Sequence, residues 1–232
     1  MRQLLLGFLF LVAVSANVPN GYFDNLVDVA PEEVLPKLVT SNSAFGLCPS
    51  ETYIDYYNEK WETSLGLDSS LTWRNASILW EKVRTMINEG NIGNFQKLCH
   101  SRDRFYYNMG QILYYQCVNL FSLLQWTDDI REAAAYVRMW QHLDFMCNVG
   151  FEQLLIPGDL KCVETASTNL TCVHEFEHNT NWSNVCPLVD TFMNCQKNLI
   201  DTACGVPNGY YACEGIRLGY GSYCTNLRCN VQ

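Results

Sequence analysis

The stretch CPLVDTFMNCQKNLIDTACG, residues 186–205, combines a helical apolar pattern with cysteines on opposite sides. Its apolar positions recur every three or four residues along one side, at Leu188, Phe192, Cys195 and Leu199. Cys186 and Cys204 are 18 residues apart, which returns to the same side of a helix at about 100° per residue, whereas Cys195 lies opposite. We therefore predict a helix over residues 187–203 that disulfides tie to its neighbours on both flanks.

Twelve cysteines occur in the chain, and they are unevenly distributed. The first two thirds holds Cys48, Cys99, Cys117 and Cys147, and the remainder holds Cys162, Cys172, Cys186, Cys195, Cys204, Cys213, Cys224 and Cys229. Both counts are even, which allows two self-contained disulfide sets, but four cysteines permit about 3 pairings and eight about 105. Structural zinc, the alternative use, needs close pairs such as C-x-x-C, and the closest pair here is Cys224 and Cys229. We favour twelve disulfide-bonded cysteines and no free thiol.

The first sixteen residues have the pattern of an export signal. Arg2 provides a positive charge, residues 4–14 are apolar, and Val14-Ser15-Ala16 provides a cleavage site. A retained anchor is the alternative, but it needs about 20 apolar residues. We expect residues 1–16 to be a signal peptide, the mature chain to be secreted, and no segment to span a membrane.

Three Asn-x-Ser/Thr sequons agree with export. They are Asn75-Ala-Ser77, Asn169-Leu-Thr171 and Asn181-Trp-Ser183. Together with the export signal they predict a eukaryotic glycoprotein in which all three asparagines face solvent. The formal net charge of −9 argues against nucleic acid and anionic lipid as partners, since both require positive charge on the protein.

Apolar stripes predict that the first two thirds is helical. The stripes run over residues 53–65, 76–87, 105–124 and 130–143, with Gly66 and Gly90 as stops and Asp129-x-x-Glu132 as a capping box. The glycine-rich segments 205–209 and 215–221 predict turns. The expected fold is an all-α, disulfide-stapled bundle with an irregular cysteine-rich C-terminal part. It is organised as regions 17–150 and 151–232, or as one continuous domain 17–232.

The spacing Cys186-Pro187-x4-Phe192-x2-Cys195-x8-Cys204-Gly205, followed by Cys213, resembles the cysteine-rich helical domains of secreted nematode proteins, some of them chondroitin-proteoglycan-like and most of unknown function. The similarity covers residues 185–229. It implies an all-helical, disulfide-bonded extracellular fold and brings no catalytic residues with it. The chain lacks a Ser-Gly dipeptide, the usual xylose acceptor for chondroitin, so the resemblance does not extend to a proteoglycan role.

One motif points to chemistry. His174-Glu175-x-x-His178 has the spacing at which a zinc peptidase presents two imidazoles to one metal, with the glutamate as general base. However, Glu177 places a charge where such helices pack against the domain, and the longer form of the motif requires Gly and His where Asn181 and Asn184 stand. A short, solvated acidic turn of helix is the alternative interpretation, and we favour it.

The remaining histidines are interpreted as structural. His142-Leu-Asp144 resembles the His-Asp pair of secreted phospholipases but lacks that family's double cysteine, so we expect His142 to be a partly buried packing residue. We expect His100 to be a polar cap near a helix end.

Three function classes remain. We favour a non-catalytic extracellular glycoprotein that binds a protein or matrix component, without a cofactor. The alternatives are a carrier of a small apolar ligand between the Tyr- and Trp-rich helices, and a zinc metallopeptidase through His174 and His178.

Overall fold

The computed structural model describes residues 46–88, 91–156, 158–179, 184–221 and 224–230. These residues form helices joined by turns and contain no strand, which confirms the predicted all-α, disulfide-stapled class. In chain order the elements are α3 (Glu51–Leu65), η1 (Trp73–Asn75, a 3-10 turn), α4 (Ala76–Asn88), α5 (Ile92–Met109), α6 (Gln111–Cys117), α7 (Leu120–Leu123), α8 (Ile130–Cys147), α9 (Phe151–Leu154), α10 (Asp159–Ala166), α11 (Thr171–Glu177), α12 (Val185–Cys204) and α13 (Val206–Tyr220). The predicted signal peptide and Asn181 lie outside the described residues.

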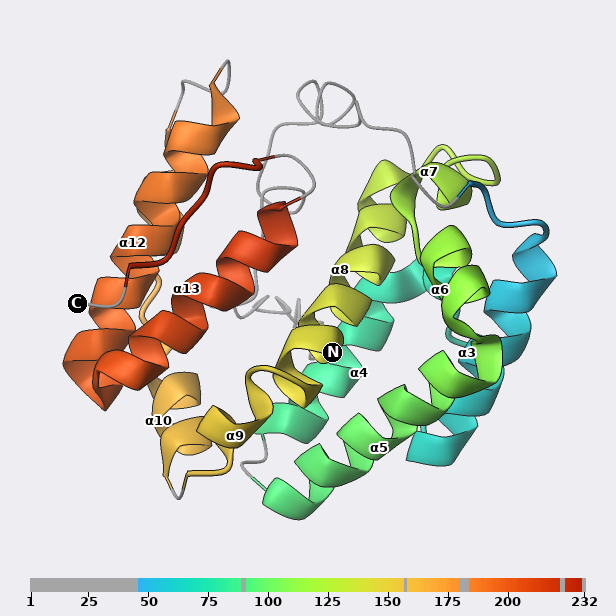
Figure 1. Ribbon diagram of the computed structural model, residues 1–232, viewed down its shortest axis with the longest axis horizontal. Coiled ribbons are helices and arrows are strands. Elements are labelled where there is room, and N and C mark those ends of the chain that lie inside the picture. The colour runs from blue at the N-terminus through green and yellow to red at the C-terminus, as the bar shows by residue number, and fades with distance from the viewer. Residues whose placement is uncertain (1–45, 89–90, 157, 180–183, 222–223, 231–232) are drawn as a thin grey trace, which may run out of the picture.

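Helix α8 is the central element (Figure 1). It packs against η1, α4 and α5 on one side and against α13 on the other, so it joins the α3–α6 bundle to the α12–α13 pair. The largest fully buried side chains of the bundle include Trp73, Tyr136 and Trp140. None of the helices in the described part of the chain is long and apolar enough to cross a membrane.

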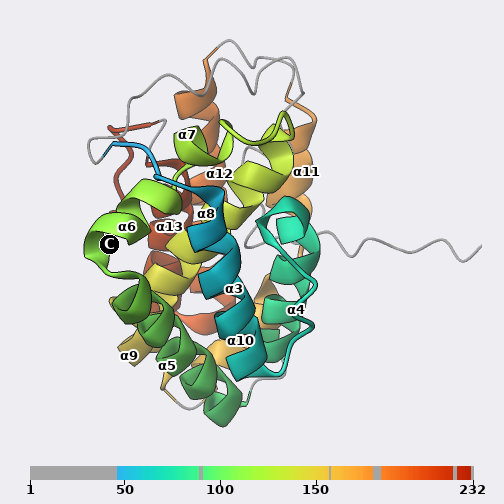
Figure 2. The same ribbon diagram turned by 90° about the vertical axis from the view of Figure 1, so that its right-hand side faces the viewer.

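Local signals explain where several helices begin and end. The hydroxyl of Ser50 accepts a hydrogen bond from the Thr52 amide at the start of α3, and Gly66 ends that helix at a φ of 78°, as predicted. At the start of α8, the Asp129 carboxylate accepts from the amides of Arg131 and Glu132. Figure 2 views the molecule from the right-hand side of Figure 1, with α3 in front of α8 and α4 to the right.

The prediction of one long apolar helix over residues 105–124 is wrong. The chain breaks after α5 at Gly110, whose φ of 80° lies outside the helical range, and resumes as α6 and then α7. As a result Ile112, counted as a core position, is 70% exposed. The apolar spacing continues across both breaks, at Gly110 and after Cys117, so periodicity alone did not reveal them.

The C-terminal third is more regular than its composition suggested. The predicted helix is confirmed as α12, but the predicted turns at 205–209 and 215–221 are wrong, because α13 runs from Val206 to Tyr220. Gly209 allows α13 to pack closely against α12. A β-carbon at Gly209 would lie 1.9 Å from Oδ1 of Asp201 on α12. Glycine permits this approach of the two helices, and their packing offsets its low helix propensity.

Residues from both predicted regions build the larger core. Leu160, Ile200 and Tyr211 belong to the same buried cluster as Trp140. The ring of Tyr211 on α13 stacks on Phe145 of α8 with centroids 5.0 Å apart. A smaller second cluster fills the space among α11, α12, α13 and the residues that follow α13.

Candidate functional site

All twelve cysteines form disulfides, as predicted, and none is free. The bonds also respect the division into two sets. The pairs are Cys48–Cys117, Cys99–Cys147, Cys162–Cys204, Cys172–Cys195, Cys186–Cys224 and Cys213–Cys229. The first two lie within the α3–α8 bundle, and the other four lie within residues 162–229.

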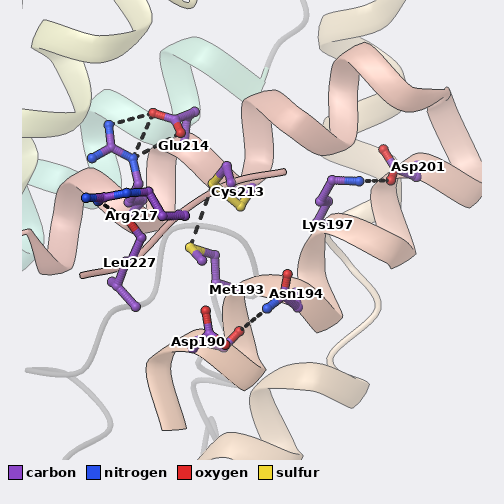
Figure 3. The surroundings of a disulfide bond; sticks show 11 residues. Asp190, Met193, Asn194, Lys197, Asp201, Cys213, Glu214, Arg217 and Leu227 are labelled. Carbon is purple, nitrogen blue, oxygen red and sulfur yellow. Dashed lines mark hydrogen bonds and ion pairs between the residues drawn. A yellow bond between two sulfur atoms is a disulfide. The ribbon is translucent and has the colours of Figure 1, made fainter. Parts of the chain in front are cut away.

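Helix α12 is cross-linked to three different segments. Cys204 bonds to α10 and Cys195 to α11, while Cys186 bonds to Cys224 beyond α13. This is the two-sided attachment predicted from the cysteine spacing. Figure 3 shows the neighbouring Cys213–Cys229 bond, whose Cys229 sulfur lies 3.8 Å from the sulfur of Met193 on α12. Two ion pairs flank it, Lys197 with Asp201 at 2.5 Å and Arg217 with Glu214 at 2.6 Å.

The zinc-type motif lies on a short exposed helix. His174 and Glu175 are exposed on α11, and the helix has ended at His178, which forms its C-cap. The two imidazole centroids are 6.2 Å apart and nearly perpendicular, and Nδ1 of His178 lies 2.8 Å from the His174 carbonyl oxygen. Among the described residues, no group of three or more His, Cys, Asp or Glu side chains is placed to hold a metal. The buried neighbour Phe176 shows that this helix contributes to the second core.

The other two histidines differ from expectation in position or burial. His100 lies in the middle of α5 and is exposed, so the prediction of a helix-end cap is wrong. His142 packs as predicted but is buried rather than partly buried, and its ring stacks on Trp80 at 5.8 Å. Burial lowers the pKa of His142 to about 3, and the positive charge of Arg138 acts in the same direction.

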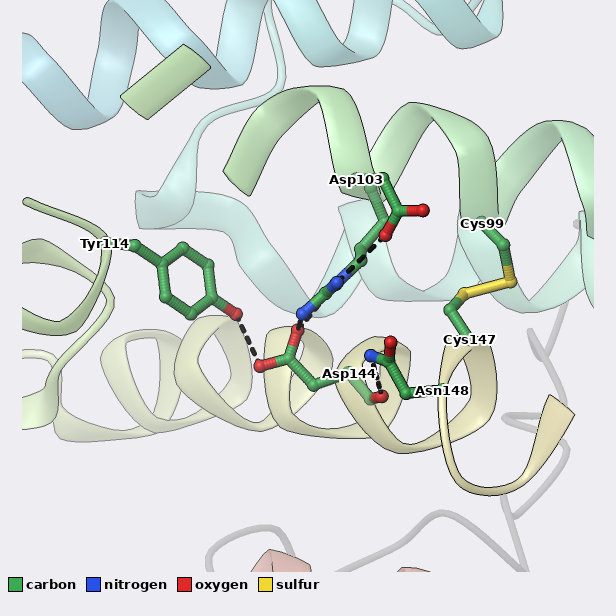
Figure 4. A network of polar contacts seen from close by, with 7 residues as sticks. Cys99, Asp103, Tyr114, Asp144, Cys147 and Asn148 are labelled. Carbon is green, nitrogen blue, oxygen red and sulfur yellow. Dashed lines mark hydrogen bonds and ion pairs between the residues drawn. A yellow bond between two sulfur atoms is a disulfide. The ribbon is translucent and has the colours of Figure 1, made fainter. Parts of the chain in front are cut away.

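Asp144 belongs to a polar network that the sequence pattern did not reveal. Nε of Arg102 donates to Oδ1 of Asp144 at 2.7 Å, and the Tyr114 hydroxyl donates to Oδ2 at 2.8 Å (Figure 4). Burial raises the pKa of the Asp144 carboxyl, while Arg102 opposes that rise. Asp103 holds the other end of the guanidinium at 2.9 Å. The network joins α5, α6 and α8 beside the Cys99–Cys147 bond, which indicates a structural role.

A carboxyl group is also buried in the bundle. Glu62 is 0% exposed, and its Oε1 accepts from Nδ2 of Asn58 at 2.8 Å, while the Tyr136 hydroxyl donates to Oδ1 of Asn58 at 3.2 Å. The second carboxyl oxygen has no hydrogen-bond partner among the described residues. Burial raises the pKa of Glu62 to about 8, and the charges of Asp68 and Glu59 add to the rise. Glu62 therefore remains protonated at neutral pH.

The candidate contact surface is a group of exposed aromatic and apolar side chains on α3, α5 and α6, which we call the tyrosine face. It consists of Tyr53, Tyr56, Tyr107, Ile112 and Tyr115. The three helices lie together on the side of the molecule that faces the reader in Figure 2. Tyr107 is 85% exposed. Of these five residues, the predicted apolar stripes included only Tyr53 and Ile112, and both are exposed in the structure.

Buried rings support two members of the tyrosine face. Tyr56 contacts Tyr57 at 5.1 Å between centroids, and Tyr57 contacts the buried Phe105 at 6.4 Å. Tyr115 contacts Tyr114 at 5.5 Å, and Tyr114 in turn contacts Phe105 at 6.2 Å. A continuous series of ring contacts therefore joins exposed Tyr56 to exposed Tyr115. Side chains held in this way lose little conformational entropy on binding.

A second surface feature is an open groove of about 460 Å³ beside the Cys186–Cys224 bond. Its lining also includes Pro187, Asp190 and Leu227. The predicted carrier site lay elsewhere, between the Tyr- and Trp-rich helices, where Phe105 and Trp140 stack at 3.9 Å.

The two described sequons occupy different environments. Asn75 is half-buried at the end of η1, whereas Asn169 is exposed between α10 and α11. The expectation that Asn75 faces solvent is therefore met only in part.

Comparison with protein-family models, with curated proteins and with solved structures finds no match to this chain. The resemblance to nematode cysteine-rich domains therefore stays a prediction.

Proposed function

We propose that this protein is an exported, N-glycosylated binding protein that recognises a protein partner through the tyrosine face and catalyses no reaction. The cross-linking of all twelve cysteines supports an oxidising compartment, because such bonds are rare in the cytosol. The observation that carries the binding role is the supported set of exposed tyrosines. Tyrosine is enriched where proteins contact one another and contributes more to binding energy than most residues.

The charge of the chain restricts the partner. A formal net charge of −9 favours association with a positively charged protein surface and raises the rate of encounter with it. We expect this contribution to weaken as the salt concentration rises, while the aromatic contacts persist.

The test compares two triple variants in their capture of secreted proteins from the source tissue. The first, Tyr56→Ser, Tyr107→Ser and Tyr115→Ser, removes the two ring-supported tyrosines and the most exposed one. The control, Ile78→Ser, Val149→Ser and Val206→Ser, removes exposed apolar side chains from other segments. A partner that binds this face is retained by wild type and control and lost from the first variant. Equal retention by all three proteins would refute the assignment.

Export and glycosylation are tested separately in eukaryotic cells. We expect the secreted protein to begin at Asn17 and to lose mass on treatment with an N-glycosidase. Retention of the protein inside the cell, or a secreted chain without N-glycan, would contradict this part of the proposal.

A small apolar ligand is a second candidate, favoured by the groove beside Cys186–Cys224. Its volume of about 460 Å³ lies within the range of ordinary ligand sites. Native mass spectrometry of protein secreted from eukaryotic cells would show a lipid-sized adduct that Leu227→Asp removes. An adduct-free spectrum would exclude a tightly held ligand.

A further inference from the structure

We propose that folding closes the Asn75 sequon to N-glycosylation, so that a glycan reaches Asn75 only before α8 docks, whereas Asn169 stays open in the folded protein. This inference rests on the glycosylation part of the proposed function and concerns the order of events. It follows from the contacts of the two residues that define each acceptor, the asparagine and the hydroxyl residue two positions later.

Glycan transfer needs access to both residues. The amide nitrogen of asparagine forms a bond to C1 of a sugar carried on a lipid diphosphate. The sugar–phosphate bond breaks, the diphosphate leaves with the electron pair, and the amide proton passes to a base of the transferase. Because only serine or threonine is accepted two residues later, the transferase must also contact that hydroxyl.

In the folded protein Ser77 is exposed to solvent, but its hydroxyl is hydrogen-bonded to another helix. It donates to Oε1 of Glu132 at 2.5 Å, and the Ser77 amide donates to Oε2 at 2.8 Å. Glu132 was predicted to complete the capping box of its own helix, α8. Instead its carboxylate accepts these two bonds at the start of α4, where a negative charge is favourable.

The asparagine is held as well. Oδ1 of Asn75 accepts from the Thr72 amide at 2.5 Å, which closes a reciprocal capping box around η1. The middle residue, Ala76, is fully buried and has helical φ and ψ of −62° and −29°. To present this acceptor in an extended form, the first turn of α4 must separate from α8.

In the Asn169 sequon the two acceptor side chains bond to each other and, within the described part of the chain, not to another helix. Oδ1 of Asn169 accepts from the amide of Thr171 at 3.1 Å and from its hydroxyl at 2.8 Å, and both residues are exposed. These bonds lie within the turn, and the middle residue Leu170 is only partly buried, so this acceptor opens at a lower cost than one whose middle residue is fully buried.

The order of synthesis makes the Asn75 sequon available for glycosylation before α8 can pack against it. Glu132 follows Ser77 by 55 residues. At a synthesis rate of about 5–20 residues per second, the acceptor is complete about 3–11 s before Glu132 has been added to the chain.

The test uses unglycosylated, disulfide-bonded protein carrying Asn181→Gln. It is incubated with a purified oligosaccharyltransferase and a lipid-linked oligosaccharide, and occupancy at each asparagine is followed by mass spectrometry. The same chain, reduced and carboxymethylated, provides the intrinsic rate ratio of the two sites. In the native protein we expect Asn75 to be slower relative to Asn169 by at least about tenfold, the factor for opening one charge-assisted hydrogen bond. Equal ratios in the native and unfolded chains would overturn the proposal.

Glu132→Ala tests whether the two hydrogen bonds from Ser77 to Glu132 slow the modification of Asn75. It is expected to accelerate modification of Asn75 and leave Asn169 unchanged, while Glu81→Ala, at an exposed position on α4, changes neither rate. Circular dichroism and a disulfide map establish that each variant is folded. A folded Glu132→Ala protein in which Asn75 remains as slow as before would refute the role of Glu132. Since all components are purified, these outcomes do not depend on whether the protein is exported in its source.

Discussion

The buried Glu62 carboxyl predicts how the free energy of unfolding changes with pH. Burial raises its pKa from 4.5 to about 8. In the unfolded chain the group ionises near pH 4.5, while in the folded protein it keeps its proton until about pH 8. Folding must therefore retain a proton that the unfolded state releases, and the stability present below pH 4.5 is lost as pH rises toward 8.

The magnitude follows from the difference between the two pKa values. A pH of 7 lies about 2.5 pH units above the pKa of this carboxyl in the unfolded chain. Release of its proton there stabilises the unfolded state, which lowers the free energy of unfolding by roughly 3 kcal/mol. Glu62→Gln removes this titration while keeping the size of the side chain and an oxygen to accept from Asn58. We expect the variant to gain about 3 kcal/mol relative to wild type between pH 4.5 and pH 7.

Denaturant unfolding of the disulfide-bonded protein, followed by tryptophan fluorescence between pH 4.5 and 7.5, measures the effect. Because the pKa of His142 is lowered, the protein also loses stability as pH falls from 6.5 toward 3. This change is common to the variant and the wild type, so the difference between their free energies of unfolding isolates the effect of Glu62. Glu81→Gln, an exposed change on α4 that does not act on the Glu62 pKa, is the control. A pH-independent difference between Glu62→Gln and wild type, or a variant less stable at pH 7.5 than at pH 4.5 relative to wild type, would refute the reasoning.

Four other expectations come from the packing, the polar network, the disulfides and the exposed histidines. Gly209→Ala should destabilise the protein by about 1–3 kcal/mol, because its β-carbon would meet Asp201 and lie 2.6 Å from the backbone oxygen of Lys197, whereas a β-carbon at Gly219 on the same helix would meet no atom closer than 4.0 Å; thermal unfolding of Gly209→Ala and Gly219→Ala checks this. Asp144→Asn should cost up to about 3 kcal/mol in chemical denaturation, since it leaves the buried Arg102 with only Asp103, and Asp103→Asn should cost much less because that carboxylate is 60% exposed. Reduction should remove hydrogen-exchange protection first from residues 158–230, which hold four of the six bonds; earlier loss over residues 51–147 would contradict this. Chelator-washed protein should contain less than stoichiometric zinc by elemental analysis, and one retained zinc that His174→Ala abolishes would revive the peptidase hypothesis.

Features that depend on short-range chemistry could be predicted from the amino-acid sequence. Gly66 ends α3, Asp129 begins α8, and the spacing of three cysteines along α12 predicted attachment on both flanks. Each of these signals acts within one or two turns of helix, so no knowledge of distant residues was needed. The even division of the cysteines likewise predicted two sets, but not the partners within each set.

The tertiary structure alone decided what depends on residues far apart in the chain. Gly209 is helical because α12 lies against it, and Glu132 caps α4 rather than its own helix because Ser77 is within reach. Glu62 looks like a surface residue in the sequence, yet packing of α3 in the bundle buries its side chain. Ile112 is exposed for a similar reason, because the chain turns at Gly110 and the residues after it form a separate helix. Apolar periodicity reports which residues share a side of a helix, whereas burial depends on which other helix covers that side.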